Sequence, residues 1–135
     1  MESKPHISVR LDGEETSIEF PAEGVTTSAA VSAVGNNLYR LDSVPLFVAS
    51  ATFADIIEAE QLPEGRLRFT RVSEKSGWQV FNFVVPRELI DSNKLAMVLA
   101  HADRLGAHWE RVFGGLLFIC VPPGVDWNPT CELKG

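Results

Sequence analysis

The stretch IIEAEQLPEGRLRFTRVS, residues 56–73, predicts a β-hairpin from which the rest of the fold can be read. Apolar and polar residues alternate along both of its ends, 56–61 and 66–73, as they do in strands with one buried face. The LPEG between them suits a type I turn, with Pro63 second and Gly65 fourth. We therefore expect two antiparallel strands joined by a tight turn.

The charged residues of this hairpin predict its register. If Glu60 faces Arg66, then Glu58 faces Arg68, and the apolar residues between them point to the opposite side. Opposite charges across neighbouring strands contribute about 0.2–1 kcal/mol per pair and help to hold the register. Such pairing favours the charged form of both glutamates, whereas a general acid needs its neutral form favoured.

Asp55 precedes the hairpin and shares the apolar side of the strand with Ile57 and Ala59. We expect it at the mouth of the strand, where it caps the preceding turn. Glu58 and Glu60 lie on one strand face, about 6.6 Å apart along the chain. Since acid–base pairs can use a spacing close to this one, catalysis by these acids stays open as an alternative.

Other strands are expected N-terminal to the hairpin. HISVRLD (6–12) alternates apolar and polar residues and puts His6 on its polar side. TSIEF (16–20) and NLYRLD (37–42) have the same character. Residues 26–34 are compatible with a helix or a strand, and their Thr and Val residues favour the strand.

A strand and a helix follow the hairpin after a predicted turn at EKSG. The strand is WQVFNFVVP (78–86), and Asp91 or Ser92 is the expected N-cap of the helix. Gly106 supplies the C-terminal stop. The apolar residues at helical spacing are Leu95, Val98, Leu99, Ala102 and Leu105.

The last two strands predict the topology of this half. LLFICV (116–121) is apolar on both faces, which is typical of a central strand, whereas AHWERV (107–112) has the pattern of an edge. The final strand then inserts between the first two, as in the opening three strands of a ferredoxin-like sheet. The tail starts like a helix at Asp126 and is too short for a full second helix and fourth strand.

These elements predict an α+β protein. An antiparallel β-meander that can close into a barrel is joined to a ferredoxin-like strand–helix–strand–strand unit. The 135 residues suit a single compact domain over 1–135. We expect its β-rich sub-module over 1–76 and its strand–helix–hairpin sub-module, with a short C-terminal tail, over 77–135.

Charge and composition exclude several classes of partner. The net charge is −6, which repels nucleic acid and anionic membranes at long range. No apolar segment has the length of a secretory signal or a membrane span, so we expect a cytoplasmic protein. One basic cluster exists, and its arginines are expected to have glutamate partners. Its members are Arg66, Arg68, Arg71 and Lys75.

The histidines, cysteines and tryptophans provide few candidates for chemistry. His6, His101 and His108 lack the spacing of a zinc site, and we expect them on a solvated surface and expect no metal or cofactor. Cys120 is expected to be a buried filler, and Cys131 is the one cysteine that could be exposed. Possible partner-binding residues are Trp127, Trp109 and His108.

The three tryptophans differ in surroundings. Trp127, in the Pro-rich tail, either packs back over the sheet or anchors a partner. Core packing is the default for Trp109, which begins an edge strand below the helix, and Trp78 opens the strand before the helix.

The motifs YRLDSVPLF (39–47), DIIEAE (55–60) and GRLRFTRVSEKSG (65–77) precede a strand, a helix ending in LG and a hairpin closing on VPP. This order resembles the bacterial domain-of-unknown-function family 4265 over about residues 24–127. The family's usual Gly before the Asp is Ala54 here, and TTSAAVSAV lacks the Trp of its N-terminal strand. The resemblance implies the fold and carries no activity.

We therefore expect a non-enzymatic cytoplasmic binding or protein-interaction module. It could self-associate along an edge such as AHWERV, or neutralise or regulate a basic protein partner. The alternative is a small acid–base hydrolase or isomerase that uses Asp55, Glu58 or a histidine. An enzyme would bury one of these groups unpaired in a closed apolar pocket, whereas a binding module would pair its acids and expose an edge or apolar patch.

Overall fold

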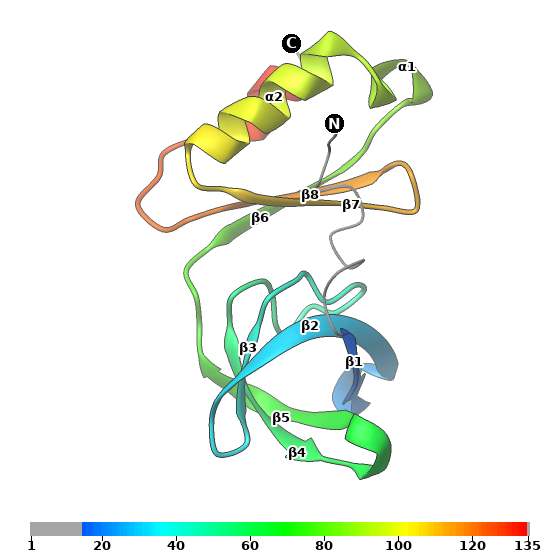
Figure 1. Ribbon diagram of the computed structural model, residues 1–135, viewed down its shortest axis with the longest axis vertical. Coiled ribbons are helices and arrows are strands. Elements are labelled where there is room, and N and C mark those ends of the chain that lie inside the picture. Colours follow the sequence, from blue (N-terminus) through cyan, green and yellow to red (C-terminus); the bar gives the residue numbers. More distant parts are fainter. Residues whose placement is uncertain (1–14, 135) are drawn as a thin grey trace. The chain divides into compact units, whose positions relative to one another are not determined.

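The chain separates into two compact units, which divide between Gly77 and Trp78 (Figure 1). The structure, a computed structural model, describes residues 15–134. We call residues 15–77 the barrel unit and residues 78–134 the sheet unit. The division lies one residue from the predicted sub-module boundary, and a single domain over the whole chain stays a prediction. The expected strand at 6–12, with His6, lies outside the described residues.

The barrel unit is a five-stranded meander that closes on itself (Figure 1). Consecutive strands pair antiparallel, so the first and fifth of an odd-numbered meander run in the same direction. They close the barrel as a parallel pair, with Ile18 opposite Leu67 and Glu19 opposite Arg68. The expected barrel-like meander is confirmed, and residues 26–34 are in a strand. The strands are β1 (Glu15–Phe20), β2 (Val25–Gly35), β3 (Leu38–Leu41), β4 (Ile56–Gln61) and β5 (Leu67–Glu74).

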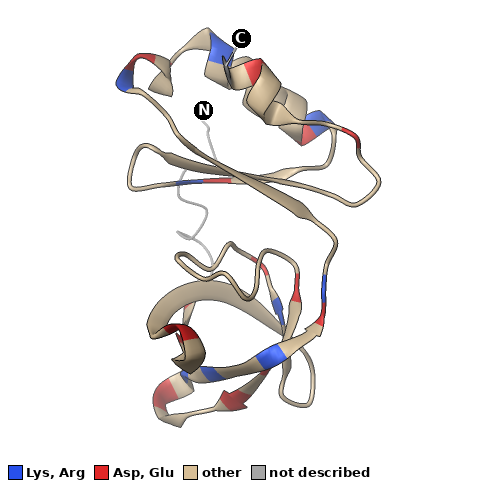
Figure 2. Cartoon of the chain, turned by 180° about the vertical axis from the view of Figure 1, so that it is seen from behind, with Lys and Arg blue, Asp and Glu red and all other residues tan. Residues whose placement is uncertain are grey.

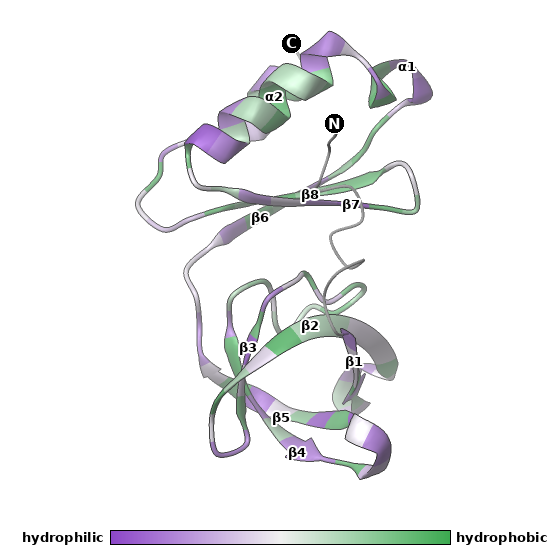
Figure 3. Ribbon diagram, in the orientation of Figure 1, coloured by the Kyte–Doolittle hydropathy of each residue, from purple (hydrophilic) through white to green (hydrophobic). Residues whose placement is uncertain are grey.

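Alternation along each strand fills the barrel with apolar side chains. On β4, Ile57 and Ala59 are buried, whereas Glu60 is exposed. Hydrophobic and hydrophilic residues also alternate along β5 (Figure 3). The rings of Phe20 and Phe69 meet inside the core at a centroid distance of 4.7 Å. The period-two pattern therefore predicted which residues face inward.

The register predicted for the hairpin is wrong. Gln61 lies opposite Leu67, so Glu60 meets Arg68 and not Arg66. The reason is a wider turn: Glu64, at φ 66°, has a left-handed backbone that a type I turn excludes, and the Leu62 amide donates to the Arg66 carbonyl.

A β-bulge then shifts the pairing further along the same hairpin. Ala59 lies opposite Phe69, but its neighbour Glu58 lies opposite Arg71, so Thr70 is the extra residue on β5. The predicted partner of Glu58, Arg68, is therefore wrong as well. Glu58 and Glu60 still lie on the outer face, because the extra residue is on β5 and the alternation of side chains along β4 is unchanged.

A surface carboxylate holds the long loop between β3 and β4. Glu23 follows β1, in a short 3-10 turn, and accepts hydrogen bonds from the amides of Ala49 at 2.8 Å and Ser50 at 3.1 Å, and from the Ser50 hydroxyl. These bonds, with the Ala49 amide first, hold the pKa of Glu23 below its ordinary value of 4.5. The carboxylate must therefore stay charged for the loop to keep its bonds.

Glu23→Gln should lower the denaturant midpoint of unfolding at pH 7. A lowered folded-state pKa stabilises the protein above the unfolded pKa, and this stability is lost as the pH falls through the folded value. The gap between wild type and variant should therefore narrow from pH 7 to pH 3, as urea unfolding at several pH values would show. Glu74→Gln, on the exposed end of β5, is the matched control. A gap that stays constant with pH would contradict this account.

The sheet unit packs its helices against a three-stranded antiparallel sheet in the order β6-β8-β7 (Figure 1). The last strand inserts between the first two, as predicted, and β8 is apolar on both faces. The expected turn at EKSG is instead part of the connection between the barrel unit and the sheet unit, because β6 pairs with β8 and not with β5. The elements are β6 (Gln79–Val84), α1 (Arg87–Ile90), α2 (Asn93–Arg104), β7 (His108–Val112), β8 (Leu116–Val121) and α3 (Pro129–Lys134).

The main helix has the predicted ends. The Leu95 amide donates to the Ser92 hydroxyl at 3.2 Å, and Gly106 follows the helix at φ 76°. Leu95, Val98 and Ala102 are buried against the sheet. The short helix α1 was not predicted, because its four residues are too few for a periodic pattern.

Candidate functional site

The hairpin acids are engaged in surface ion pairs. Glu58 lies 2.8 Å from the Nε of Arg71, and Glu60 lies 3.3 Å from the Nη1 of Arg68. Acidic and basic residues are interspersed on β4 and β5 (Figure 2). The predicted neutralisation of these acids by arginines is confirmed, although the partners differ. Neither glutamate has the buried environment that a general acid needs.

Asp55 is fully buried and has a structural role. Its Oδ2 accepts a hydrogen bond from the Thr52 amide at 3.0 Å, which confirms the predicted cap of the preceding turn. Its Oδ1 accepts another from the Ser76 amide at 2.8 Å, and Lys75 lies 3.6 Å away. Asp55 thus ties the loop before β4 to the segment after β5.

One carboxylate joins His101 to the C-terminal helix. The Nδ1 of His101 lies 3.0 Å from Glu132, and the indole of Trp127 donates to the same carboxylate oxygen at 2.6 Å. The rings of His101 and Trp127 lie edge to face at 5.0 Å. Trp127 therefore packs back onto the core of the sheet unit, the first of its two predicted roles.

The two faces of the edge strand β7 differ: one face has an aromatic core residue, and the other has a histidine–glutamate pair. Trp109 is in the core, where its indole donates to Asp103 at 3.2 Å. On the other face, the Nε2 of His108 lies 2.7 Å from Glu110, which is completely buried. The solvated surface predicted around His108 is therefore wrong. The predicted partner-binding roles of Trp109 and His108 stay predictions.

The two cysteines differ in their exposure to solvent. Burial, and then the charge of Glu110, raise the pKa of the Cys120 thiol, so that it stays protonated. Cys131 is exposed. Within residues 15–134, no three His, Cys, Asp or Glu side chains are grouped as a metal ion would require. None of the described helices has the length and apolar character to cross a membrane.

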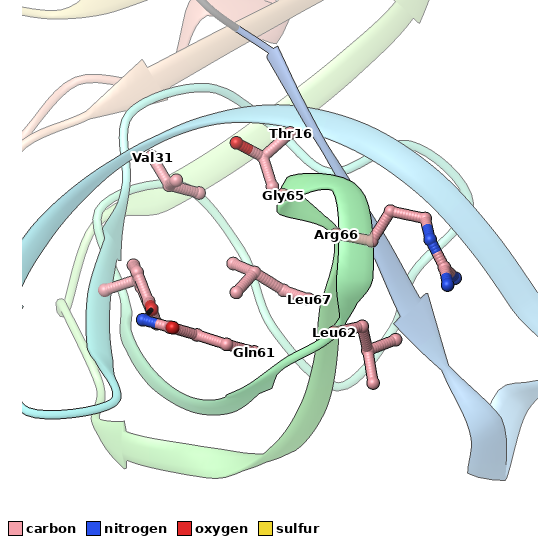
Figure 4. Close-up of a pocket in the computed structure, with 8 residues that line it drawn as sticks. Thr16, Val31, Gln61, Leu62, Gly65, Arg66 and Leu67 are labelled. Atoms are coloured by element: carbon pink, nitrogen blue, oxygen red, sulfur yellow. Dashed lines mark hydrogen bonds between the residues drawn. The ribbon is translucent and has the colours of Figure 1, made fainter.

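One end of the barrel opens into a pocket of about 260 Å³ (Figure 4). Each strand contributes one inward-facing residue to it, and the turn between β4 and β5 forms its rim. Of the two charged or amide-bearing side chains there, Gln61 points into the opening, whereas Arg66 points away from it (Figure 4). The five wall residues, in strand order, are Thr16, Val31, Tyr39, Gln61 and Leu67; the rim consists of Leu62, Gly65 and Arg66.

Two exposed phenylalanines have unusual backbones. Phe113, at the tip of the β7–β8 hairpin, has φ 56° and is 78% exposed. Phe47, in the loop between β3 and β4, has φ 65° and is 75% exposed. A bulky side chain in the left-handed region is a true outlier, because its Cβ crowds the backbone. Both aromatic rings therefore remain in water at positions that disfavour them.

Sequence reasoning missed both features, although a signal for the pocket was present. Thr16, Tyr39 and Gln61 have the inward parity of their strands, so each places a polar group inside the barrel. A polar residue at an inward strand end is the pattern of an open barrel mouth. The left-handed backbones of Phe47 and Phe113 could not be predicted from the sequence, because this conformation is expected at glycine and asparagine and not at phenylalanine.

Comparison with known proteins identifies the family. The sequence profile described as "Domain of unknown function (DUF4265)" matches residues 27–132. The chain belongs to this family. The resemblance carried by the turn and strand motifs is thereby confirmed. Ala54, the position at which the resemblance implies a Gly, has a left-handed backbone at φ 70°, which glycine adopts without strain.

Among solved structures, the chain is similar to one titled "Novel crystal structure of a hypothetical protein from Neisseria gonorrhoeae". The TM-score is 0.59 at 18% sequence identity, over 90% of this chain and 83% of that chain. At this identity the likeness shows the fold alone. No match was found among curated proteins.

Proposed function

We propose that the protein is a non-enzymatic cytoplasmic protein-interaction module that binds its partner through the exposed phenylalanines Phe47 and Phe113. The observation that carries this proposal is the coincidence of a strained backbone and an exposed aromatic ring at both positions. Such strain costs about 1–2 kcal/mol per residue and persists where the surrounding structure imposes it, often at binding sites. A partner that covers the rings would offset this cost.

In the sheet unit, Phe113 lies beside an apolar row that crosses all three strands. Val84, Leu116 and Val112 are aligned by the strand register, and Val84 is 84% exposed. Exposed apolar patches often mark protein-interaction sites, and aromatic side chains are enriched there. This row supports Phe113 as the main anchor.

The acid–base alternative receives less support. Of the groups it would use, those within residues 15–134 are engaged elsewhere: Asp55 by two backbone amides, Glu58 by Arg71, and His101 by Glu132. Neither these groups nor His108 lines the pocket at the barrel mouth. An enzyme needs such a group in contact with substrate, so the arrangement favours a binding module.

The finer parts of the proposal have separate support. A basic protein partner is suggested by the net charge of −6. Self-association along β7 is suggested by its place at one end of the described sheet. The strand order β6-β8-β7, with α2 between β6 and β7 in the sequence, supports a relationship of the sheet unit to the opening half of a ferredoxin-like fold.

Phe113→Asn should separate binding from stability. Asparagine tolerates the left-handed backbone, so we expect the free energy of unfolding to stay within about 1 kcal/mol of wild type or to rise. Loss of an aromatic anchor should reduce recovery of the partner at least about tenfold. Affinity capture from native lysate with quantitative mass spectrometry would measure recovery, and urea unfolding would measure stability.

Met97→Gln is the matched control, because Met97 is 70% exposed on the regular helix α2. This variant should recover the partner as wild type does, and Phe47→Asn should show whether the barrel unit contributes. Equal recovery of the same protein by Phe113→Asn would contradict the proposed anchor. Recovery of the protein alone with a bound metabolite would favour the enzyme.

A further inference from the structure

The barrel mouth combines polar groups with an apolar wall. Small barrels usually fill their interior with side chains, and the mouth of a barrel is a common place for a ligand. Here Val31 and Leu67 supply aliphatic surface, while Thr16 adds a hydroxyl at the start of β1. Neither Phe47 nor Phe113 lines the pocket, so different variants test the pocket and the proposed interface.

A hydrogen-bonded pair in the wall presents unused hydrogen-bonding capacity. The Gln61 amide donates to the Tyr39 hydroxyl at 2.8 Å, while the Tyr39 residue is only 8% exposed. Among residues 15–134, no group accepts the Tyr39 hydroxyl proton, and none donates to the Gln61 carbonyl oxygen. The pair therefore offers the Tyr39 hydroxyl and the second Gln61 N–H as donors and the Gln61 carbonyl oxygen as an acceptor. Exchange of the Gln61 oxygen and nitrogen would preserve this balance, because the hydroxyl would then donate and the amide hydrogens would be available.

Among the described residues 15–134, the pocket lining directs no charged group towards a ligand. Arg66 is the charged residue that borders it, and its Nη1 is held by Glu19 at 2.7 Å (Figure 4 shows the side chain directed away). An anion would lose its hydration without a cation in the wall, and a cation would find no carboxylate there. The described lining therefore favours a neutral ligand.

The pocket's volume limits the ligand further. At about 260 Å³ it is smaller than the roughly 300–1,000 Å³ of sites for drug-sized molecules. We propose that the barrel mouth binds an uncharged aliphatic carboxamide of side-chain size, which pairs its amide with Tyr39 and Gln61 and packs its apolar part on Val31 and Leu67. Such a group can come from a free small amide or from a glutamine of another chain.

Amide-detected NMR titration of the full chain tests this proposal with isovaleramide and its near-isosteric anion isovalerate. Isovaleramide should produce saturable shifts at the wall residues with a millimolar Kd, and isovalerate should bind at least about tenfold more weakly. Capped Gly-Gln-Gly and Gly-Glu-Gly peptides form the second arm. Preference for the glutamine peptide over isovaleramide would identify a chain-borne group, and the reverse would identify a free amide.

Tyr39→Phe keeps the ring and removes the hydroxyl, and Gln61→Leu removes the amide. Each should weaken isovaleramide binding at least about tenfold while the dispersion of the NMR spectrum shows an intact fold. Glu60→Gln, the outward-facing neighbour of Gln61, should leave binding unchanged. The proposal is overturned if the shifts do not saturate, if isovalerate binds equally well, or if Tyr39→Phe binds like wild type.

Discussion

Replacing Trp109 with alanine should lower the free energy of unfolding by about 3–5 kcal/mol, the range for large aromatic side chains removed from a core. Trp109 is 5% exposed and packs with Val98 and Ile119 in the core of the sheet unit. The variant would also lose the indole hydrogen bond to Asp103. Urea unfolding followed by circular dichroism would measure the change.

Trp127→Ala provides the comparison for this result. Trp127 is only partly buried against the same core, so we expect a loss smaller than that of Trp109→Ala. If Trp109→Ala kept wild-type stability and instead lost a captured partner, the indole would be a binding residue and its assignment to the core would be wrong.

Replacing Asp55 with alanine should destabilise the barrel unit by about 3 kcal/mol. The carboxylate is the acceptor for the amides of Thr52 and Ser76, and loss of a buried acceptor costs about 1–3 kcal/mol for each donor. Amide NMR signals of Thr52 and Ser76 should shift most, and urea unfolding would give the free energy.

Glu58→Ala is the matched control on the same strand. Its ion pair with Arg71 is largely exposed, so the change should stay within about 1 kcal/mol. A catalytic role for Asp55 would produce the opposite pattern: removal of an active-site acid often raises stability while activity disappears. Wild-type or higher stability of Asp55→Ala would therefore reopen the acid–base alternative.

Local patterns predicted most of the elements of this fold. The alternation of Ile57 and Ala59 with Glu58 and Glu60 indicated a strand with one buried face, and the structure has that face. The cap was predicted as Asp91 or Ser92, and Ser92 provides it; capping is predictable because it depends on neighbours within one helical turn. These features arise from interactions that are close in the sequence.

Pairing between strands was predicted less well. The register of Glu58 and Glu60 depends on the left-handed backbone of Glu64 and on the bulge at Thr70. Glutamate is not a residue type that predicts a left-handed backbone, and threonine is not one that predicts a bulge. The pocket is lined by residues from all five strands of the barrel, so the sequence alone did not show that these residues lie together. Tyr39 and Gln61, for example, are 22 positions apart in the sequence and share a hydrogen bond.

The parallel seam of the barrel has a consequence for how the chain folds. Ile18 and Leu67 are 49 positions apart, and all the other strand pairs of the barrel unit join consecutive strands. Local hairpins can form early, but water is excluded from the interior of the barrel only when β1 pairs with β5. Because closing a longer loop costs more chain entropy, we expect this parallel pair to form last in the folding of the unit.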